Sequence, residues 1–322
     1  MGQHVRMSKS TVAAHHLPSV TEVGPGSPAA WRRGLGALME GCAEHDGVAS
    51  FNEQTRLEVY EDGGHPWTGF ACAIDGELRG YAHLSHTGHR ACPWLIEAAV
   101  HPHFRRKGIG AILVRQALQA AAGRGGGPVL LWGHGDGAGS RALAAALGLT
   151  GKRRLECWAR AVSHEVEQPV PPEGIRFRSF RPGHDEGRWL SANAEIFAEH
   201  PEQGHWDAHD LAARERSAWF DPSGFLLAED DSGIAGFCWV KVHRSGRKRS
   251  GEIYVIGVHP RVRGLGLAGV LVSAGLEHMA GVGCRRALLY VDDSSEAAKA
   301  IFGSRGFVFA WADCGYVTDG AS

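Results

Sequence analysis

The chain has 322 residues, of which 43% are hydrophobic and 21% charged, a composition ordinary for a folded globular protein. Its 34 lysines and arginines balance 35 aspartates and glutamates, so the overall charge gives no reason to expect a nucleic acid or a membrane as partner. No run of 18 apolar residues occurs, residues 1–16 lack the apolar core of a signal peptide, and the seven cysteines include no C-x-x-C pair. We therefore expect a cytoplasmic protein with reduced thiols.

The length of the chain predicts two domains, each large enough to bury a core of its own. Residues 1–20 mix polar side chains with few large apolar ones, and we expect a disordered arm there. Leu35, Leu38 and Cys42 then recur at helical spacing, and Asp75-Gly76 joins two short strands in a hairpin. The predicted helices of the first half are 31–44, 53–59, 109–122 and 140–147, and its predicted strands are 70–74, 79–84, 95–100, 129–132 and 154–162.

Three prolines, Pro169, Pro171 and Pro172, mark residues 165–174 as a stiff polar linker. The second half repeats the order of elements. Its predicted helices are 187–197, 208–219, 268–279 and 297–302, and its predicted strands are 175–180, 224–229, 234–242, 253–258, 286–291 and 307–312. We thus predict an N-terminal domain at 21–164 and a C-terminal domain at 175–319. Mostly antiparallel strands around a central strand-loop-helix unit favour an α+β fold with a mixed sheet.

A basic, glycine-rich loop lies between strand 253–258 and the helix that follows it. Because Gly264 and Gly266 carry no side chains, several backbone N–H groups can converge on a phosphate at the positive end of that helix. Arg263 adds a positive charge. The spacing Arg263-x-x-Gly266-x-Ala268 is neither the P-loop pattern, which needs Gly-Lys-Ser/Thr, nor the G-x-G-x-x-G pattern. The loop therefore predicts a diphosphate site of another type.

The same pattern occurs earlier in the chain, after strand 95–100. Each position of the first loop lies 158 residues before its counterpart in the second. The matching positions are Val100 and Val258, Arg105 and Arg263, Gly108 and Gly266, Trp132 and Tyr290, and Leu149 and Phe307. Because the register holds without a gap over about fifty positions, we predict two tandem copies of one domain.

Both loops, and the order of the elements around them, resemble the GNAT acetyltransferases, whose corresponding loop binds the diphosphate of acetyl-CoA. The resemblance covers nearly the whole of both halves and implies a GNAT fold in each. It also implies contacts with acetyl-CoA, which in the first copy are Ala98, Ala99, Val100, Arg105, Arg106, Lys107, Gly108, Ile109 and Gly110. In the second copy they are Ile256, Gly257, Val258, Arg263, Gly264, Leu265, Gly266, Leu267, Ala268 and Gly269.

The second half carries more specific motifs. They are FAEHPEQGHW (197–206), WFDPSGFLLA (219–228), GFCWVK (236–241), GEIYVIGVHP (251–260), LYV (289–291) and a final Gly-Phe (306–307). This set resembles the mycothiol synthases, actinobacterial tandem-GNAT enzymes that acetylate the cysteine amine of cysteinyl-glucosaminyl-inositol. The resemblance implies that both copies bind acetyl-CoA and that the C-terminal copy carries the chemistry. In the N-terminal copy the bound acetyl-CoA is expected to be structural.

Glu252, at the start of the strand that leads into the second loop, is the candidate general base. Transfer of an acetyl group from a thioester to an amine requires a neutral amine, an oxyanion partner and an acid for the departing thiolate. By the resemblance Glu252 removes the proton of the amine, and a merely polar strand end is the alternative. Its counterpart in the first copy is Trp94, while the nearby Glu97 matches Val255, which strict alternation places on the opposite face of the strand. The N-terminal copy is therefore predicted to lack the base.

The resemblance also implies contacts with the acceptor substrate, which are Glu53, Glu199, Lys241, Glu252 and Tyr290. Carboxylates suit an acceptor with an ammonium group and many hydroxyls, because they accept several hydrogen bonds at once. Three of these residues have a plainer alternative, since Glu53 fits a solvated helix face, Lys241 an exposed strand end and Tyr290 a packed strand. We expect a small-molecule amine as the partner and a monomeric chain.

Phe302 stands where the mycothiol synthases place a tyrosine that protonates the leaving thiolate. Phenylalanine cannot donate a proton, and Ser294-Ser295 replaces an asparagine of the same motif. Water, Tyr290 or Tyr316 could protonate the thiolate, or the CoA thiolate could leave with little help because it is a weak base. The remaining alternative is a changed or lost activity. A changed or lost activity corresponds to two rival functions: acetylation of another small amine, or binding of acetyl-CoA without catalysis.

Two groups of histidines play no part in this scheme. They are His83, His86 and His89, and His200, His205 and His209. The first group falls on a predicted strand and loop, without the fixed helical face of a metal site, and we predict no metal. The basic segment 244–249 is interpreted as a solvated hairpin tip.

Overall fold

The computed structural model describes residues 19–61, 66–86, 92–163, 169–198, 203–245 and 248–318. The first half contributes β1 (Ser19–Val23), α1 (Ala29–Asp46), α2 (Glu53–Tyr60), β2 (Trp67–Ile74), β3 (Glu77–His86), β4 (Trp94–Val100), α3 (Ile109–Gly123), β5 (Val129–Gly133), α4 (Ala138–Ala146) and β6 (Leu149–Ala161). The second half contributes β7 (Arg176–Ser179), α5 (Glu186–Ile196), α6 (Ala208–Glu215), β8 (Phe225–Asp230), β9 (Gly233–Ser245), β10 (Lys248–Val258), α7 (Leu267–Gly281), β11 (Arg286–Asp292), α8 (Glu296–Ser304) and β12 (Val308–Thr318).

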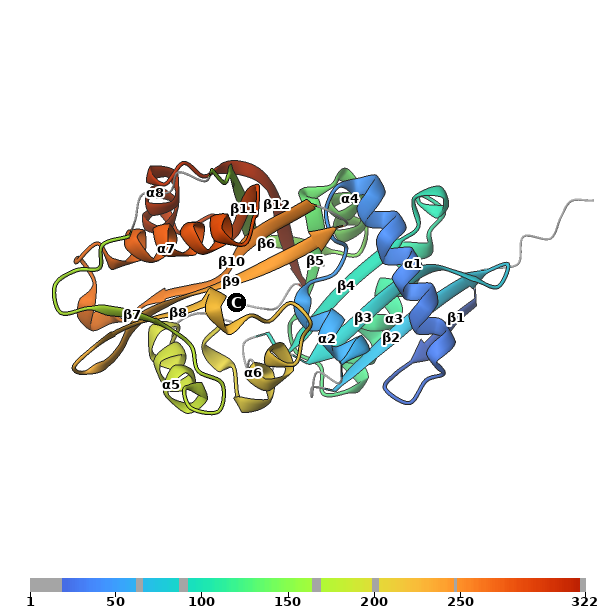
Figure 1. Ribbon diagram of the computed structural model, residues 1–322. Helices are drawn as coiled ribbons and strands as arrows, with labels where there is room; N and C mark the ends of the chain where they lie inside the picture. Colours follow the sequence, from blue (N-terminus) through green and yellow to red (C-terminus); the bar gives the residue numbers. More distant parts are fainter. Residues whose placement is uncertain are drawn as a thin grey trace, which may run out of the picture.

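All of these strands join one continuous sheet. Their order is β1-β2-β3-β4-β5-β12-β6-β11-β10-β9-β8-β7 (Figure 1). The neighbours β4 and β5, and β10 and β11, run parallel, whereas the other adjacent strands run antiparallel. The mixed sheet confirms the α+β class that the sequence predicts.

The closing strands of the two halves are exchanged. β12, the last strand of the chain, lies between β5 and β6, and β6 lies between β12 and β11. Tyr316 of β12 pairs with Leu131 of β5, while Cys157 of β6 pairs with Tyr290 of β11. The closing strand of each half therefore lies beside the strands of the other half. The sequence did not predict this exchange.

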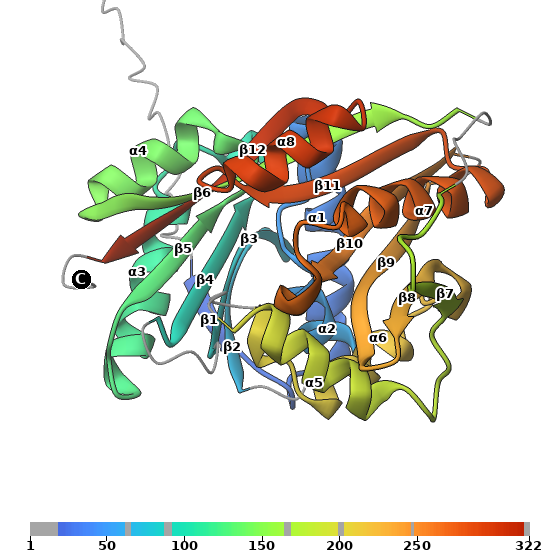
Figure 2. The ribbon, with the colours of Figure 1, turned by 90° about the vertical axis from the view of Figure 1, so that its left-hand side faces the viewer.

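Helices cover both faces of the sheet in each half. In the second half, Leu271 and Leu276 of α7 pack with Cys238 of β9 on one face, while Trp189 of α5 packs with Trp239 on the other. The alternation of Cys238 and Trp239 is what a strand buried on both faces requires. Figure 2 shows α7 and α8 along one side of this part of the sheet and α5 and α6 along the other. In the first half α3 and α1 occupy the corresponding positions.

Several element bounds differ from the sequence prediction. β1 begins at Ser19, inside the arm predicted for residues 1–20, and residues 1–18 lie outside the described part. The helix predicted for 208–219 ends at Glu215, and both closing strands are longer than predicted because each is paired along both of its edges. The domain boundaries at 164 and 175 stay a prediction, and residues 164–168 are not described.

Candidate active site

The two central strands of the second half separate near the glycine-rich loop. β10 and β11 pair only from Ser250 to Ile253 of β10. The register of β10 against β9 shifts between Ile253 and Val255, which marks a β-bulge at Tyr254. Beyond the bulge a cavity of about 130 Å³ opens between β10 and β11. Its lining residues are Phe197, Gln203, Ile253, Tyr254, Val255, Ile256, Leu289, Tyr290 and Phe302.

The bulge decides which side chains of β10 share a face. Ile253 packs in the core beneath α7, whereas Tyr254 and Val255 both join the aromatic cluster beneath α5 and α6. The extra residue thus returns Val255 to the face that carries Glu252, which strict alternation excludes. The expectation that Val255 lies on the face opposite to Glu252 is therefore wrong.

Glu252 of β10 precedes Ile253, the first residue of this strand that lines the cavity, and Tyr254 and Tyr290 of the lining interact electrostatically with its carboxylate. Its Oε2 is 2.7 Å from Nε2 of His243, and its side chain is 15% exposed. Burial raises the pKa of the carboxyl, but the hydrogen bond from His243 and the charges of His243 and Lys241 outweigh it and hold the pKa below its usual value. Glu252 is therefore a carboxylate near neutral pH.

Lys241 of β9 lies directly across from Glu252 and is buried. Its ammonium forms an ion pair with Glu53 of α2, in the other half of the chain, and lies 4.7 Å from the ring centre of Trp219. Burial lowers the pKa of Lys241 to about 8, against the opposing charge of Glu252. Trp219 Nε1 donates to the second carboxylate oxygen of Glu53 at 3.0 Å. The structure thus brings three of the sequence-predicted residues, Glu53, Lys241 and Glu252, into one cluster.

The sequence reasoning missed Arg214 of α6, which contacts Tyr254 of β10 near this cluster. Arg214 is buried, and its guanidinium lies 3.9 Å from the ring centre of Trp206. It donates to the Tyr254 hydroxyl at 2.8 Å and to Gln54 of α2 at 3.0 Å. An arginine in a helix pattern carries no local signal of such a role, because its partners lie far away in the sequence.

Tyr290 of β11 lines the same cavity and is 39% exposed. Burial of the phenol, with Cys157 of β6 and the charges of Glu252 and Asp313, raises its pKa well above the usual value. The phenol therefore keeps its proton and can donate a hydrogen bond into the cavity. Burial likewise raises the pKa of the Cys157 thiol to about 12, so this cysteine is not a thiolate nucleophile.

Phe302 of α8 lines the cavity as well, at the position where the sequence suggested a missing acid. It is buried, and its ring meets Phe307 edge to face. Of the two tyrosines proposed as substitutes, Tyr316 belongs to the core of the first half and pairs with Leu131 of β5. The suggestion that Tyr316 protonates the thiolate is therefore wrong, and Tyr290 stays as the phenol at this site.

The glycine-rich loop adopts the conformation that the sequence predicts. Gly264 and Gly266 have φ of +85° and +75°, values that side chains with a Cβ rarely adopt. Gly266 is the N-cap of α7, whose first N–H groups consequently point into the loop, and Arg263 is exposed beside it. The carbonyl of Gly269 is held by Arg305 at 3.1 Å. The loop is thus an open, positive helix terminus.

The pattern of the Acetyltransferase (GNAT) family matches residues 40–149 and 190–307. The mycothiol acetyltransferase of Thermobispora bispora is 42% identical over 275 residues, which cover 84% of this chain and 90% of that protein. The mycothiol acetyltransferase of Salinispora arenicola is 44% identical over 273 residues, covering 84% and 87%. The chain belongs to the GNAT acetyltransferase family. At this identity over most of its length it belongs with the mycothiol acetyltransferases within that family.

Solved structures agree with the tandem GNAT architecture. A tandem GNAT protein from the clavulanic acid biosynthesis pathway superposes with a TM-score of 0.72, at 17% identity, over 93% of this chain and 98% of its own. A GCN5-related N-acetyltransferase from Sphaerobacter thermophilus gives a TM-score of 0.68 at 24% identity, over 93% and 95%. The protein is therefore an N-acetyltransferase built from two GNAT regions in one sheet.

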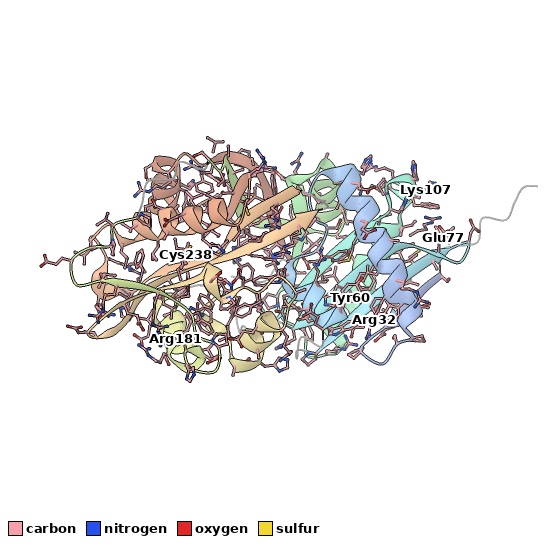
Figure 3. The ribbon with its side chains drawn as sticks, viewed as in Figure 1. Arg32, Tyr60, Glu77, Lys107, Arg181 and Cys238 are labelled. Carbon is pink, nitrogen blue, oxygen red and sulfur yellow. The ribbon has the colours of Figure 1, made fainter. Side chains whose placement is uncertain are left out.

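The N-terminal GNAT region has a comparable loop with different residues and contacts at the matching positions. Gly108 is the N-cap of α3 with φ of +82°, and Arg106 takes a positive φ of +62° where the second loop has Gly264. Arg105, in contrast to Arg263, donates two hydrogen bonds of 2.7 Å to Asp46 of α1. Lys107 lies 5.0 Å from the ring centre of Phe104, at the outer surface of this half (Figure 3).

Glu97 of the N-terminal GNAT region belongs to a network of hydrogen bonds and ion pairs. Glu97 of β4 is held by the backbone N–H of Asn52 at 3.0 Å and by the Thr55 hydroxyl at 2.6 Å. His134, which follows β5, bridges Glu97 at 2.5 Å and Asp313 of β12 at 2.8 Å. The register of β4 against β3 is regular, without the bulge seen in β10.

The other predicted residues have plainer surroundings. His83 is buried and bonded to Tyr81 at 2.9 Å and to Glu58 at 2.7 Å. Within the described ranges, no three His, Cys, Asp or Glu side chains lie close enough together to hold a metal ion. In the same part of the chain, no helix is long and apolar enough to cross a membrane. Glu199 lies outside the described residues, as do His89 and His200.

Proposed function

We propose that the protein transfers the acetyl group of acetyl-CoA to the cysteine amine of cysteinyl-glucosaminyl-inositol and so forms mycothiol. The observation that carries the proposal is Glu252, a largely shielded carboxylate with a lowered pKa on β10, just before the residues of this strand that line the cavity. The relatives named mycothiol acetyltransferase, alike over most of the chain, support the choice of acceptor.

The proposed site for acetyl-CoA is the second loop and the strand before it. The N–H groups at the start of α7 and the Arg263 side chain can bind the diphosphate, as glycines at φ +85° and +75° let the backbone approach it. Because β10 and β11 stop pairing at Ile253, the backbone of Ile256–Val258 has one edge left for the pantetheine arm and for the acetyl oxygen. The cavity at this edge suits the acetyl group.

Glu252 is proposed as the general base. The acceptor arrives as an ammonium, and its proton passes to the Glu252 carboxylate, which leaves a lone pair on nitrogen. The nitrogen attacks the acetyl carbon, an N–C bond forms, and the thioester C–S bond then breaks. The second proton of the nitrogen passes through water to the departing thiolate, so CoA is released as the thiol. Tyr290, whose raised pKa keeps its proton in place, donates a hydrogen bond to that sulfur. Proton transfer from the phenol itself is not required, because a thiolate is a good leaving group and water can protonate it once the C–S bond is broken.

The remaining contacts of the acceptor are proposed from the same cluster. Glu53 and Lys241 face one another beside Glu252, and carboxylates paired with an ammonium suit a ligand with many hydroxyls. Glu199 is proposed as a further contact on resemblance alone. The N-terminal region is proposed to bind acetyl-CoA through residues 98–100 and 105–110 without turnover, since Glu97 is fully occupied by its three partners.

A monomer in the cytoplasm is the proposed state of the enzyme. One chain supplies both sides of the site, because Glu53 of α2 and Lys241 of β9 meet within it. The seven cysteines, all within the described residues, form no disulfide, which suits a reducing compartment.

The test is release of CoA from acetyl-CoA by the purified protein in the presence of cysteinyl-glucosaminyl-inositol. Wild type is compared with Glu252→Gln and with Phe302→Tyr, and acetyl-CoA binding of all three is measured by calorimetry. We expect turnover that falls at least roughly 100-fold in Glu252→Gln while acetyl-CoA binding persists. Binding without turnover in wild type contradicts the proposal. Rescue by Phe302→Tyr then indicates a silenced enzyme, and acetylation of another amine in a substrate panel indicates a different acceptor.

A further inference from the structure

His243 links the buried carboxylate of Glu252 to solvent. It lies two residues beyond Lys241 on β9, on the same face of the sheet, and its Nε2 is 2.7 Å from Oε2 of Glu252. The side chain of His243 is 41% exposed and that of Glu252 only 15%. One end of the imidazole therefore touches the base, and part of the His243 side chain is open to water.

The reaction needs such a link. When the acceptor arrives as an ammonium and CoA leaves as a thiol, each turnover forms one N–C bond, breaks one C–S bond and releases one proton. That proton is first taken up by Glu252, which is largely shielded from water. Before the next turnover the carboxyl must lose it again.

Five titratable side chains from four strands interact electrostatically with Glu252. They are Lys241 and His243 of β9, Tyr254 of β10, Tyr290 of β11 and Cys157 of β6. The pKa of Tyr254, Tyr290 and Cys157 is raised, so these groups hold their protons, and the Lys241 ammonium is held by Glu53. A neutral imidazole at His243 can accept a proton at Nε2 and release one from Nδ1.

We propose that His243 is the positioning and proton-relay residue of Glu252, and that it returns the proton of each acceptor amine to solvent. The proposal rests on the proposed role of Glu252 as base. In the relay, the carboxyl proton of Glu252 passes to Nε2 of neutral His243, and the resulting imidazolium gives its Nδ1 proton to water. The carboxylate is restored and the imidazole is again neutral, and proton exchange with water then moves its proton from Nε2 back to Nδ1 before the next turnover.

Two variants separate the relay from mere positioning. His243→Gln keeps a side-chain N–H that can hydrogen-bond to Glu252 but cannot carry a proton, and His243→Ala leaves space for added imidazole. We expect kcat to fall about tenfold or more in both variants, with the KM for the acceptor little changed. Added imidazole should restore kcat in His243→Ala only. The exposed His184, in the turn before α5, provides the matched control His184→Ala, in which neither kcat nor its response to imidazole changes.

The outcomes are distinct. Full activity in His243→Gln shows a positioning role alone and overturns the relay, as does a His243→Ala variant that imidazole does not rescue. A second readout needs no acceptor: the nitrogen NMR shifts of the His243 imidazole in wild type and in Glu252→Gln. We expect the Nε2 shift to change in Glu252→Gln, because Nε2 is 2.7 Å from Oε2 of Glu252 in the wild type. Such a change in a protein that releases no CoA leaves the pair established and overturns only the proposed function. An unchanged Nε2 shift overturns the relay itself.

Discussion

The ammonium of Lys241 and the carboxylate of Glu53 form a mostly buried ion pair across the two halves of the chain, from residues 188 positions apart. The side chain of Lys241 is 8% exposed and that of Glu53 21%. Both also contact Trp219, through its ring and its indole N–H. The N-terminal half therefore contributes one wall of the proposed site in the C-terminal half.

Glu53→Gln is expected to weaken both stability and acceptor binding. The substitution leaves the Lys241 ammonium buried with Glu252 as its nearest remaining counter-charge, and the free energy of unfolding should fall by about 2 kcal/mol. The KM for the acceptor should rise while acetyl-CoA binding stays the same. Urea denaturation and steady-state kinetics measure the two effects. Arg176→Met, which removes the exposed ion pair of Arg176 with Asp231, is the control and should change stability by less than about 1 kcal/mol. Equal effects of the two substitutions contradict the structural role of the buried pair.

The His134 bridge predicts a pH dependence of stability. Bonds to Asp313 and Glu97 outweigh burial and raise the pKa of His134 from 6.5 to about 10. Between these values the folded protein holds a proton that the unfolded chain has lost, so the free energy of unfolding falls as pH rises from about 6.5 to about 10, by a few kcal/mol. Urea denaturation across this range measures the slope. In the double variant His134→Gln/Asp313→Asn the contribution is absent, and the two curves should converge at high pH. Parallel curves contradict the assignment.

The glycine-rich loops were predictable from sequence because their conformation is a local property. Gly264 and Gly266 mark positive φ directly, and the repeat of 158 residues located the second example. Glu252 could be assigned as base from the motif around it. The bulge at Tyr254 could not be found this way, since Tyr and Val are ordinary strand residues whether or not an extra residue is inserted. Because the bulge inserts one residue, Val255 lies on the same face of the strand as Glu252.

Long-range partners account for most of what the sequence missed. β6 and β12 have similar closing patterns, so nothing local shows that Cys157 pairs with Tyr290 rather than with its own half. The contact of Arg214 with Gln54 joins positions 160 apart, and neither residue carries a motif. His243 lay next to the known GFCWVK motif and could have been noticed, because its alternation with Lys241 places both beside Glu252.

The strand exchange predicts that the two halves cannot be separated without unfolding. β6 lies between β12 and β11, and β12 lies between β5 and β6. The strands of each half are therefore paired with the closing strand of the other half. A protease site inserted at residues 169–174 should be cut in the folded protein, after which both fragments elute together in size-exclusion chromatography until urea is added. Each half expressed alone should be poorly folded by circular dichroism, because the edges of β5 and β11 are left exposed. Fragments that separate under native conditions contradict the exchange.

Tyr290 offers the sharpest test of how the leaving sulfur is stabilised. Tyr290 and Phe302 both line the cavity, but Phe302 has no hydrogen-bond donor. Tyr290→Phe removes one hydrogen bond that matters only as charge develops on sulfur, so kcat should fall roughly 10- to 100-fold with acetyl-CoA binding unchanged. The double variant Tyr290→Phe/Phe302→Tyr should recover part of that loss, since it returns a phenol to the cavity from α8. Cys157→Ala, which alters the neighbour of Tyr290 without removing its hydroxyl, should retain most of the activity. Undiminished turnover in Tyr290→Phe shows that the thiolate of CoA leaves without a protein donor. In that case the lack of a phenol at position 302 does not lower kcat.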